Sequence, residues 1–265
     1  MRIKKMFRPY RFTNLLLIMI VVLAFSVTYA AATDSNWSYC APPSPTCTNG
    51  PTQWGGTCQS GKSQSPIDIM QPKPTKLPKI EFSYHKTSVH VVNNGHTIEA
   101  SYGEGSASNT ITLDGVVYTL VNFHFHVPSE HSLKNKSYPM ELHLVHKSKE
   151  GQLAVVGVLL TEGTENPLFG EVLKNAPAQG GSSPAIEVNA DQLLPGDHNF
   201  DDIPYYTYSG SLTTPPCSEG VTWLVLTRTK SVSEKQVKAF QGFYPANARP
   251  VQNLNGRTVK ESKHE

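Results

Sequence analysis

The sequence predicts a mainly β fold of the α+β class, with one domain around a large, mostly antiparallel central β-sheet and a few short peripheral helices. Three observations support this prediction. Short segments in which apolar and polar residues alternate recur along most of the chain, as half-buried strands require. The 20 prolines and 19 glycines are scattered between these segments, where they mark turns. No linker-like stretch divides the 265 residues, so a single domain is expected.

The expected strands follow one another closely, and several are joined by Asn-Gly or Asp-Gly signals typical of hairpin turns. Segment 153–160 is apolar throughout, which is typical of a buried central strand. Helices are expected at 167–175, more weakly at 191–194, and at 234–240 after Ser233 as the N-terminal cap. Besides two histidine-bearing segments, the expected strands are 80–84, 89–93, 97–100, 110–113, 116–121, 153–160, 205–209 and 221–227.

Residues 1–30 have the pattern of a secretory signal peptide. Five basic residues precede the apolar segment 15–27, and small residues follow it, so cleavage is expected after Ala30 or Ala32. An uncleaved anchor is the alternative, although this apolar segment is short for a bilayer span of about 20 residues. We therefore expect a catalytic domain at 31–265 that is exported to the periplasm or the extracellular space, with no stable membrane span after processing.

Removal of the leader changes the charge of the chain. The 265 residues carry 23 basic and 21 acidic side chains, and residues 1–30 hold five of the basic ones and no acidic one. The remainder carries 18 basic and 21 acidic residues, a net charge of −3. Because no basic patch is left, nucleic-acid binding is not expected.

Four cysteines in an exported chain predict two disulfides, for which three pairings exist. Cys40 and Cys47 are close in sequence and flank a proline-rich loop that a local bridge could close. Cys58 and Cys217 would then pair over a long range. A zinc site of thiolates is the competing interpretation, but it needs paired Cys-x-x-Cys spacing, which is absent.

Three histidines form the most distinctive pattern. In FHFH at 123–126, the period of two places His124 and His126 on one face of a strand. In ELHLVH at 141–146, His143 shares a face with the preceding glutamate. Two such strands side by side bring three imidazoles together, and three nitrogen ligands with one open position are typical of a catalytic zinc site.

A single histidine on an apolar strand is more often a packed, hydrogen-bonded residue than a ligand. His131 and His146 fall outside the shared face, so we expect this structural role for both. The zinc prediction depends on the grouping of the other three.

Eight short motifs match those of one enzyme family in order and in spacing. By these motifs the chain resembles an α-class carbonic anhydrase, from residue 37 to residue 257, and VPSEH at 127–131 resembles the bacterial and plant-type members. The motifs are QSPIDI (64–69), NNGH (93–96), FHFH (123–126), SEH (129–131), ELHLVH (141–146), SLTTPPC (211–217), VTW (221–223) and NARPVQ (247–252).

The resemblance implies one Zn2+ per chain, held by His124, His126 and His143. It also implies the reversible hydration of carbon dioxide to bicarbonate and a proton, through attack of a zinc-bound hydroxide on CO2. Zinc lowers the pKa of its bound water to about 7, and carbonic anhydrase is itself the standard example of this effect. Inhibition by sulfonamides or anions is expected on the same ground.

Further residues take roles through the resemblance. Each ligand ring should be fixed by one hydrogen-bond partner. The pairs are Asn122 with His124, the backbone carbonyl at Asn247 with His126, and Glu141 with His143. Thr213 should accept a hydrogen bond from the zinc-bound hydroxide and donate its own proton to Glu130, which orients the nucleophile.

His96 is the expected proton shuttle, because an imidazole takes up and releases a proton near neutral pH. Tyr39 and Asn93 resemble the residues that order the water chain of the shuttle, and Thr214 resembles the residue that contacts bicarbonate. The apolar wall that receives CO2 is implied to consist of Val145, Val155, Leu212, Val221 and Trp223.

The chain departs from the family pattern between Trp37 and Trp54, where a longer insert holds Cys40 and Cys47. The resemblance implies the disulfide Cys58–Cys217 of bacterial and extracellular relatives, which leaves Cys40–Cys47 as the second.

Two other functions are considered. A non-catalytic binding or adhesion domain of this family typically lacks a ligand histidine, and all three are present here. A zinc peptidase of the His-Glu-x-x-His type is excluded by the spacing.

Overall fold

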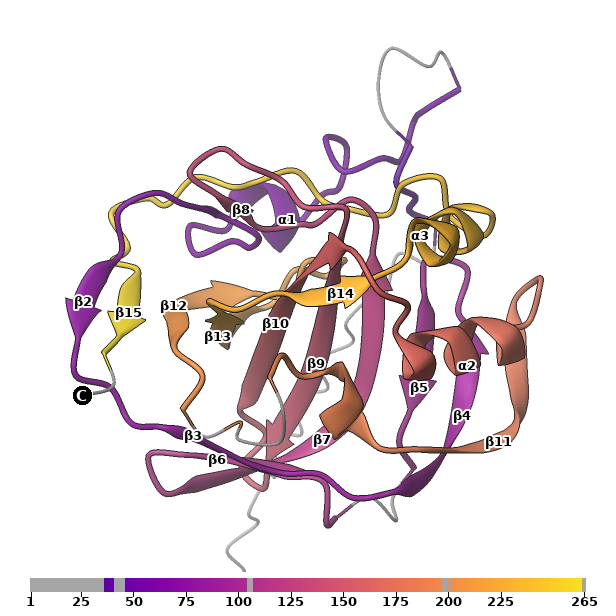
Figure 1. Ribbon diagram of the computed structural model, residues 1–265. Coiled ribbons are helices and arrows are strands. Elements are labelled where there is room, and N and C mark those ends of the chain that lie inside the picture. The colour runs from indigo at the N-terminus through magenta and orange to yellow at the C-terminus, as the bar shows by residue number, and fades with distance from the viewer. Residues whose placement is uncertain (1–35, 41–45, 104–106, 197–199, 201, 264–265) are drawn as a thin grey trace, which may run out of the picture. The chain divides into compact units, whose positions relative to one another are not determined.

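The computed structural model describes residues 36–40, 46–103, 107–196, 200 and 202–263, and strands dominate them (Figure 1). All of these residues belong to one compact unit, Thr33–Glu265. The expected signal peptide at 1–30, with both cleavage points, lies outside the described residues. Within the described part of the chain, no helix has the length and apolar character needed to cross a membrane.

Thirteen strands form one sheet, and two short strands, β1 (Asp68–Ile69) and β8 (Ser132–Leu133), pair separately. The helices are α1 (Thr57–Ser60), α2 (Pro167–Asn175) and α3 (Glu234–Gln241), with a 3-10 helix η1 (Ala190–Leu193). The strands of the large sheet are β2 (Lys73–Thr75), β3 (Ile80–Ser83), β4 (Thr87–Asn93), β5 (Ile98–Ser101), β6 (Thr110–Leu113), β7 (Val116–His126), β9 (Met140–Ser148), β10 (Leu153–Glu162), β11 (Gly181–Val188), β12 (Tyr205–Ser211), β13 (Glu219–Leu226), β14 (Lys230–Val232) and β15 (Lys260–Ser262).

The main path of the sheet runs β11-β4-β5-β7-β9-β10-β13-β12-β15-β2. Most neighbouring strands are antiparallel, which confirms the predicted fold class. Strand β10 runs parallel to β13 and β14, and β15 runs parallel to β2. The sheet is therefore mixed, with its antiparallel centre formed by β5, β7, β9 and β10.

The expected elements lie within two residues of the observed ones, with two differences. Segment 116–121 is not a separate strand, because β7 continues from it through the histidine segment to His126. The weak helix expected at 191–194 is the single 3-10 turn η1, which the Asn189 side chain caps. Helix α1 and the strands β1, β2, β8, β11, β14 and β15 were not expected from the sequence.

Strand β7 separates the core from the histidine face. Phe123 and Phe125 point into the main hydrophobic cluster, as the period of two requires. The ring of Phe125 lies 4.3 Å from that of Phe169 on α2 and 6.3 Å from that of Phe240 on α3, measured between centroids. The two helices thus cover the face of β7 opposite to the histidines.

Helices α2 and α3 lie side by side (Figure 1), and hydrogen bonds join their N-termini. The Asn166 side chain caps α2, and Ser233 and Gln236 form a capping box on α3. The buried Gln236 amide also exchanges two hydrogen bonds with the backbone of Asn166, at 2.6 and 2.9 Å. One side chain therefore links the starts of both helices.

Candidate metal centre

Three histidine rings gather on the face of β7 and β9 that lies opposite the main hydrophobic cluster. His124 lies directly opposite His143 in the register of the two strands, and His126 follows two residues along β7. The ring centroids are 5.1 Å apart for His124 and His126, 5.3 Å for His124 and His143, and 4.6 Å for His126 and His143. One nitrogen from each ring lies within 4.8 Å of the other two.

A hydrogen bond to an oxygen holds one nitrogen of each ring. An imidazole that donates from one nitrogen carries its lone pair on the other, so the second nitrogen of each ring is available to a metal. These are Nε2 of His124, Nε2 of His126 and Nδ1 of His143. The holding bonds join His124 Nδ1 to Asn122 Oδ1 (2.9 Å), His126 Nδ1 to the Asn247 carbonyl (2.7 Å) and His143 Nε2 to Glu141 Oε1 (2.9 Å).

The residues fit a zinc ion. His126 Nε2 is buried and has no hydrogen-bond partner among the described residues, a position that a metal would satisfy. Burial lowers the pKa of His124 well below its usual range, and the two neighbouring rings lower it further. Burial also lowers the pKa of His126. Neutral imidazoles are the protonation state that binds metal, and three of them leave a fourth position open on zinc.

Glu141 connects the centre to a second histidine. Its Oε1 lies 2.7 Å from His131 Nδ1, and its Oε2 accepts from the His131 backbone N–H at 2.7 Å. The other ring nitrogen of His131, Nε2, lies 2.7 Å from the Tyr208 hydroxyl. Burial by itself raises the pKa of Glu141, but the charges and hydrogen bonds of His131 and His143 hold it well below its usual range.

This cluster is a hydrogen-bond network and not a second metal site. His131, Glu141 and His143 also place ligand atoms close together, but both nitrogens of His131 already have partners at 2.7 Å. His131 is thus a packed, hydrogen-bonded residue. His146 is one too, since its Nε2 lies 2.7 Å from the Tyr84 hydroxyl. Neither belongs to the metal centre.

Glu130 faces the centre from one side. Its Oε1 accepts from the backbone N–H of Arg249 at 2.8 Å. Its Oε2 is buried without a hydrogen-bond partner among the described residues, and lies 3.6 Å from His126 Nε2 and 3.9 Å from His143 Nδ1. Thr213 is buried, but within the described ranges no hydrogen bond joins its hydroxyl to Glu130. The contact that the family resemblance implies is therefore not formed in this structure.

A compact apolar surface continues from the histidines across the sheet. Val145 on β9 pairs with Val155 on β10, which pairs in turn with Trp223 on β13. The Trp223 ring centroid lies 4.8 Å from that of His143, so this surface reaches the metal centre. The five residues expected to form the CO2 wall all belong to one hydrophobic cluster: Val145, Val155, Leu212, Val221 and Trp223.

The expected shuttle residue lies in the hairpin after β4. The half-buried His96 ring stacks face to face on the Trp37 indole, with centroids 3.6 Å apart and planes at 10°. Asn93 donates to the Pro177 carbonyl at 2.8 Å, and its oxygen accepts from Gly95 N at 3.1 Å. The Tyr39 hydroxyl is buried without a partner among the described residues, and burial raises its pKa well above the usual value.

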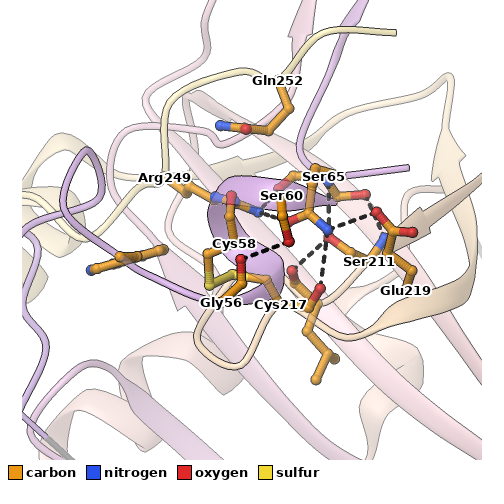
Figure 2. Close-up of a disulfide and its surroundings, with 12 residues drawn as sticks. Gly56, Cys58, Ser60, Ser65, Ser211, Cys217, Glu219, Arg249 and Gln252 are labelled. Atoms are coloured by element: carbon orange, nitrogen blue, oxygen red, sulfur yellow. Dashed lines mark hydrogen bonds between the residues drawn. A yellow bond between two sulfur atoms is a disulfide. The ribbon is translucent and has the colours of Figure 1, made fainter. Parts of the chain in front are cut away.

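The chain contains the disulfides Cys58–Cys217 and Cys40–Cys47. Figure 2 shows Arg249 and Ser65 around the first of them. The Cys58 carbonyl accepts from Arg249 Nη2 at 2.8 Å, and Cys217 N donates to the Thr214 carbonyl at 2.8 Å. This disulfide therefore anchors both the turn that carries Thr214 and the segment whose backbone holds Glu130.

Sequence reasoning missed Arg249 and Gln64, although both lie in motifs that the resemblance used. The Arg249 guanidinium is buried and donates from Nη1 to Gln64 Oε1 at 2.9 Å, while Gln64 Nε2 donates to the Cys217 carbonyl at 3.1 Å. A buried charge next to a carboxylate with a free oxygen is a signal of function, but only the folded chain brings these groups together.

The fold and the site define a class: a mainly β enzyme with an open three-histidine centre of the kind that catalytic zinc uses. Comparison with known proteins identifies the family. The family model of eukaryotic-type carbonic anhydrase matches residues 49–263. A carbonic anhydrase of Klebsiella pneumoniae is 40% identical over 249 residues, which cover 91% of this chain and 96% of the relative.

Solved structures agree. The α-carbonic anhydrase of Thermovibrio ammonificans, in complex with sulfanilamide, has a TM-score of 0.76 and 38% identity over 84% of this chain and 98% of its own. The Chlamydomonas reinhardtii carbonic anhydrase, in complex with acetazolamide, has a TM-score of 0.76 and 35% sequence identity, and the match covers 86% of this chain and 99% of that one. The chain belongs to the α-class carbonic anhydrase family, and it is an enzyme of that family.

Proposed function

We propose that this enzyme hydrates CO2 reversibly at one zinc ion held by His124, His126 and His143. The observation that carries the proposal is the triplet of ring nitrogens within 4.8 Å, each on a ring whose other nitrogen bonds to an oxygen. A zinc ion there supplies a Lewis acid that makes a water molecule nucleophilic at neutral pH. The water oxygen adds to the carbon of CO2, which gives bicarbonate and a proton.

Two residues orient the attacking water. In the working enzyme Thr213 would donate its hydroxyl proton to Oε2 of Glu130; the structure does not form this bond, but it leaves Oε2 without another partner among the described residues. The Thr213 oxygen can then only accept a hydrogen bond from the water, so the lone pair of the water turns toward CO2. Arg249 supports this arrangement, because its backbone N–H fixes the other oxygen of Glu130.

The substrate enters, and the proton leaves, by different routes. CO2 has no net charge, so the apolar wall that ends at Trp223 receives it next to the rings, and Thr214 contacts the bicarbonate product. The proton passes through water, ordered by Tyr39 and Asn93, to His96, which releases it to buffer. Partial burial lowers the pKa of His96 from its usual value, and this favours release near neutral pH.

The decisive experiment measures zinc content and stopped-flow CO2 hydration on the same samples. We expect one zinc per chain and fast hydration, and we expect His124→Ala to lose most of both, because two imidazoles hold zinc poorly. His85→Ala, which removes an exposed histidine outside the centre, is the matched control. Full activity of a zinc-free preparation would overturn the proposal.

Export is part of the proposal. Two disulfides in the described residues, with no free cysteine among them, suit an oxidising compartment. Expression with the native N-terminus should give a mature protein that begins at Ala31 or Thr33, as read by intact mass. A full-length product in the membrane fraction would instead support the uncleaved anchor.

Inhibition tests the same centre. The two relatives described above were solved with sulfanilamide and with acetazolamide. We expect acetazolamide to inhibit hydration by this enzyme, and to lose its binding in the zinc-depleted protein. Binding of equal strength without zinc would place the inhibitor elsewhere.

A further inference from the structure

The segment that departs from the family pattern lies against the expected shuttle. Trp37 stacks on His96 at 3.6 Å between centroids, and it is three residues from Cys40. Cys40 is bonded to Cys47, with their Cα atoms 5.4 Å apart, so the residues from Cys47 onward lie beside those from Trp37 to Cys40 as the two arms of a turn. The position of the indole therefore depends on how this turn is held.

Two residues that flank the disulfide, Ser38 and Asn49, join the two arms of the turn. Ser38 N donates to the Asn49 carbonyl at 2.9 Å, and Ser38 Oγ donates to Asn49 Oδ1 at 2.8 Å. The Asn49 amide also donates to the Asn36 carbonyl at 3.3 Å. Asn49 thus contacts the residues on both sides of Trp37, while the disulfide keeps Asn49 and Ser38 opposite each other.

Aromatic rings complete the support. Trp54 and Tyr39 meet Trp37 edge to face, at 5.1 and 5.3 Å between centroids. The Trp54 indole N–H is shared between the carbonyls of Ser38 and Asn49, at 3.2 and 3.1 Å. Trp37 is therefore fixed on one side by its neighbours and presents its face to His96 on the other.

We propose that the Cys40–Cys47 disulfide and the Ser38–Asn49 bridge act as a positioning clamp for His96, through the Trp37 stack. The proposal rests on the proposed function, in which His96 carries the proton. Proton transfer depends on the distance and orientation of the group that receives the proton. A fixed indole restricts the imidazole to one orientation, so the clamp sets the rate of proton release and leaves the reaction of CO2 untouched.

The clamp predicts a split between kinetic constants. The proton leaves after CO2 has reacted, so a loosened shuttle lowers kcat and leaves kcat/KM unchanged. We expect the double variant Cys40→Ser/Cys47→Ser to lose kcat severalfold, and added imidazole to restore it. Trp37→Ala should behave in the same way, whereas Trp37→Phe keeps a ring for stacking and should retain most of kcat.

A second measurement does not depend on activity. In the NMR spectrum of the zinc-loaded protein, the ring protons of His96 lie over the Trp37 indole and should be shifted upfield by its ring current. The His96→Ala variant assigns these signals. The upfield shift should be lost in Cys40→Ser/Cys47→Ser and in Trp37→Ala. It should persist in Thr48→Ala, an exposed change in the same turn.

The outcomes separate the clamp from the proposed function. If the native protein shows no hydration but the cysteine variant loses the upfield shift, the clamp stands and the proposed function fails. If hydration is fast and both the shift and kcat are unchanged in a cysteine variant with native zinc content and melting temperature, the clamp is wrong. Should the cysteine variant not fold, Asn49→Ala removes the side-chain bonds from Asn49 to Ser38 and Asn36 with the disulfide intact, and an unchanged shift and kcat would then overturn the inference.

Discussion

At the scale of single residues, the candidate metal centre includes Glu141, which is fully buried and joins His143 to His131. Glu141→Gln keeps the size but presents one amide oxygen where two carboxylate oxygens accepted. We expect zinc affinity to fall by about 10- to 100-fold, because the held ring becomes a weaker and less ordered ligand. Competition with a chelator measures this. Exposed Glu150→Gln should leave the affinity unchanged, and an unchanged affinity in Glu141→Gln would contradict the role.

His146 makes stability depend on pH. Burial lowers its pKa from 6.5 to about 3, so the folded chain keeps it neutral while the unfolded chain binds a proton below pH 6.5. The free energy of unfolding should therefore fall as pH drops from 6.5 toward 3, by about 1.4 kcal/mol per pH unit from this residue.

The paired variant His146→Phe/Tyr84→Phe removes this titration together with the hydroxyl that contacts it. In urea unfolding of zinc-free protein, its loss of stability between pH 6.5 and 5 should be about 2 kcal/mol smaller than that of the native chain. His85→Phe, an exposed change, should keep the native dependence. Parallel pH profiles for the native chain and the paired variant would show that His146 titrates normally.

At the scale of elements, one side chain, Gln236, makes the hydrogen bonds that join the starts of α2 and α3. Gln236→Ala leaves the buried backbone N–H of Asn166 without a partner, removes one of the two donors to the Asn166 carbonyl, and should cost about 2–3 kcal/mol in denaturant unfolding. Ser233→Ala removes a helix cap alone and should cost about 1 kcal/mol. Lys235→Ala, on the exposed face, should change stability by less than about 0.5 kcal/mol. Equal costs for Gln236→Ala and Ser233→Ala would mean that the join to α2 contributes nothing.

The elements that sequence reasoning found carry their own local signals. Helix α2 has the predicted bounds, and the structure shows Asn166 as its cap and Pro167 at its first position. Strands β7 and β9 alternate so regularly that the shared face of the three histidines followed from the period of two. Strand β11 was missed because it contains Pro184 and several small residues, a composition that suits an edge strand and resembles a loop.

The missed parts of the site are long-range contacts. Arg249 meets Cys58 across 191 residues, and His131 meets Tyr208 across 77. Neither pair has a spacing or a periodicity that a sequence pattern could show. Register could be inferred for adjacent strands, but contacts between distant loops appear only when the whole sheet has closed.

At the scale of the whole molecule, the two disulfides should contribute unequally. Cys58–Cys217 closes a separation of 159 residues and Cys40–Cys47 one of 7, so the loop-entropy model gives about 5 and about 2 kcal/mol. Guanidinium unfolding of Cys58→Ser/Cys217→Ser and of Cys40→Ser/Cys47→Ser tests this ranking. We expect Cys58→Ser/Cys217→Ser to lose more unfolding free energy, and it also frees the turn of Thr214. The reverse order would contradict the model.

The carbonyl of Asn247 on His126 has a consequence for the order in which the protein is made. All three histidines of the proposed zinc site leave the ribosome more than a hundred residues before Asn247 does. Until that late segment docks, nothing fixes the second ring, and Glu130 lacks the N–H of Arg249 as well. If the proposed zinc site is right, a nascent or truncated chain should hold the metal loosely, and tight retention of zinc should mark a molecule whose synthesis and assembly are complete.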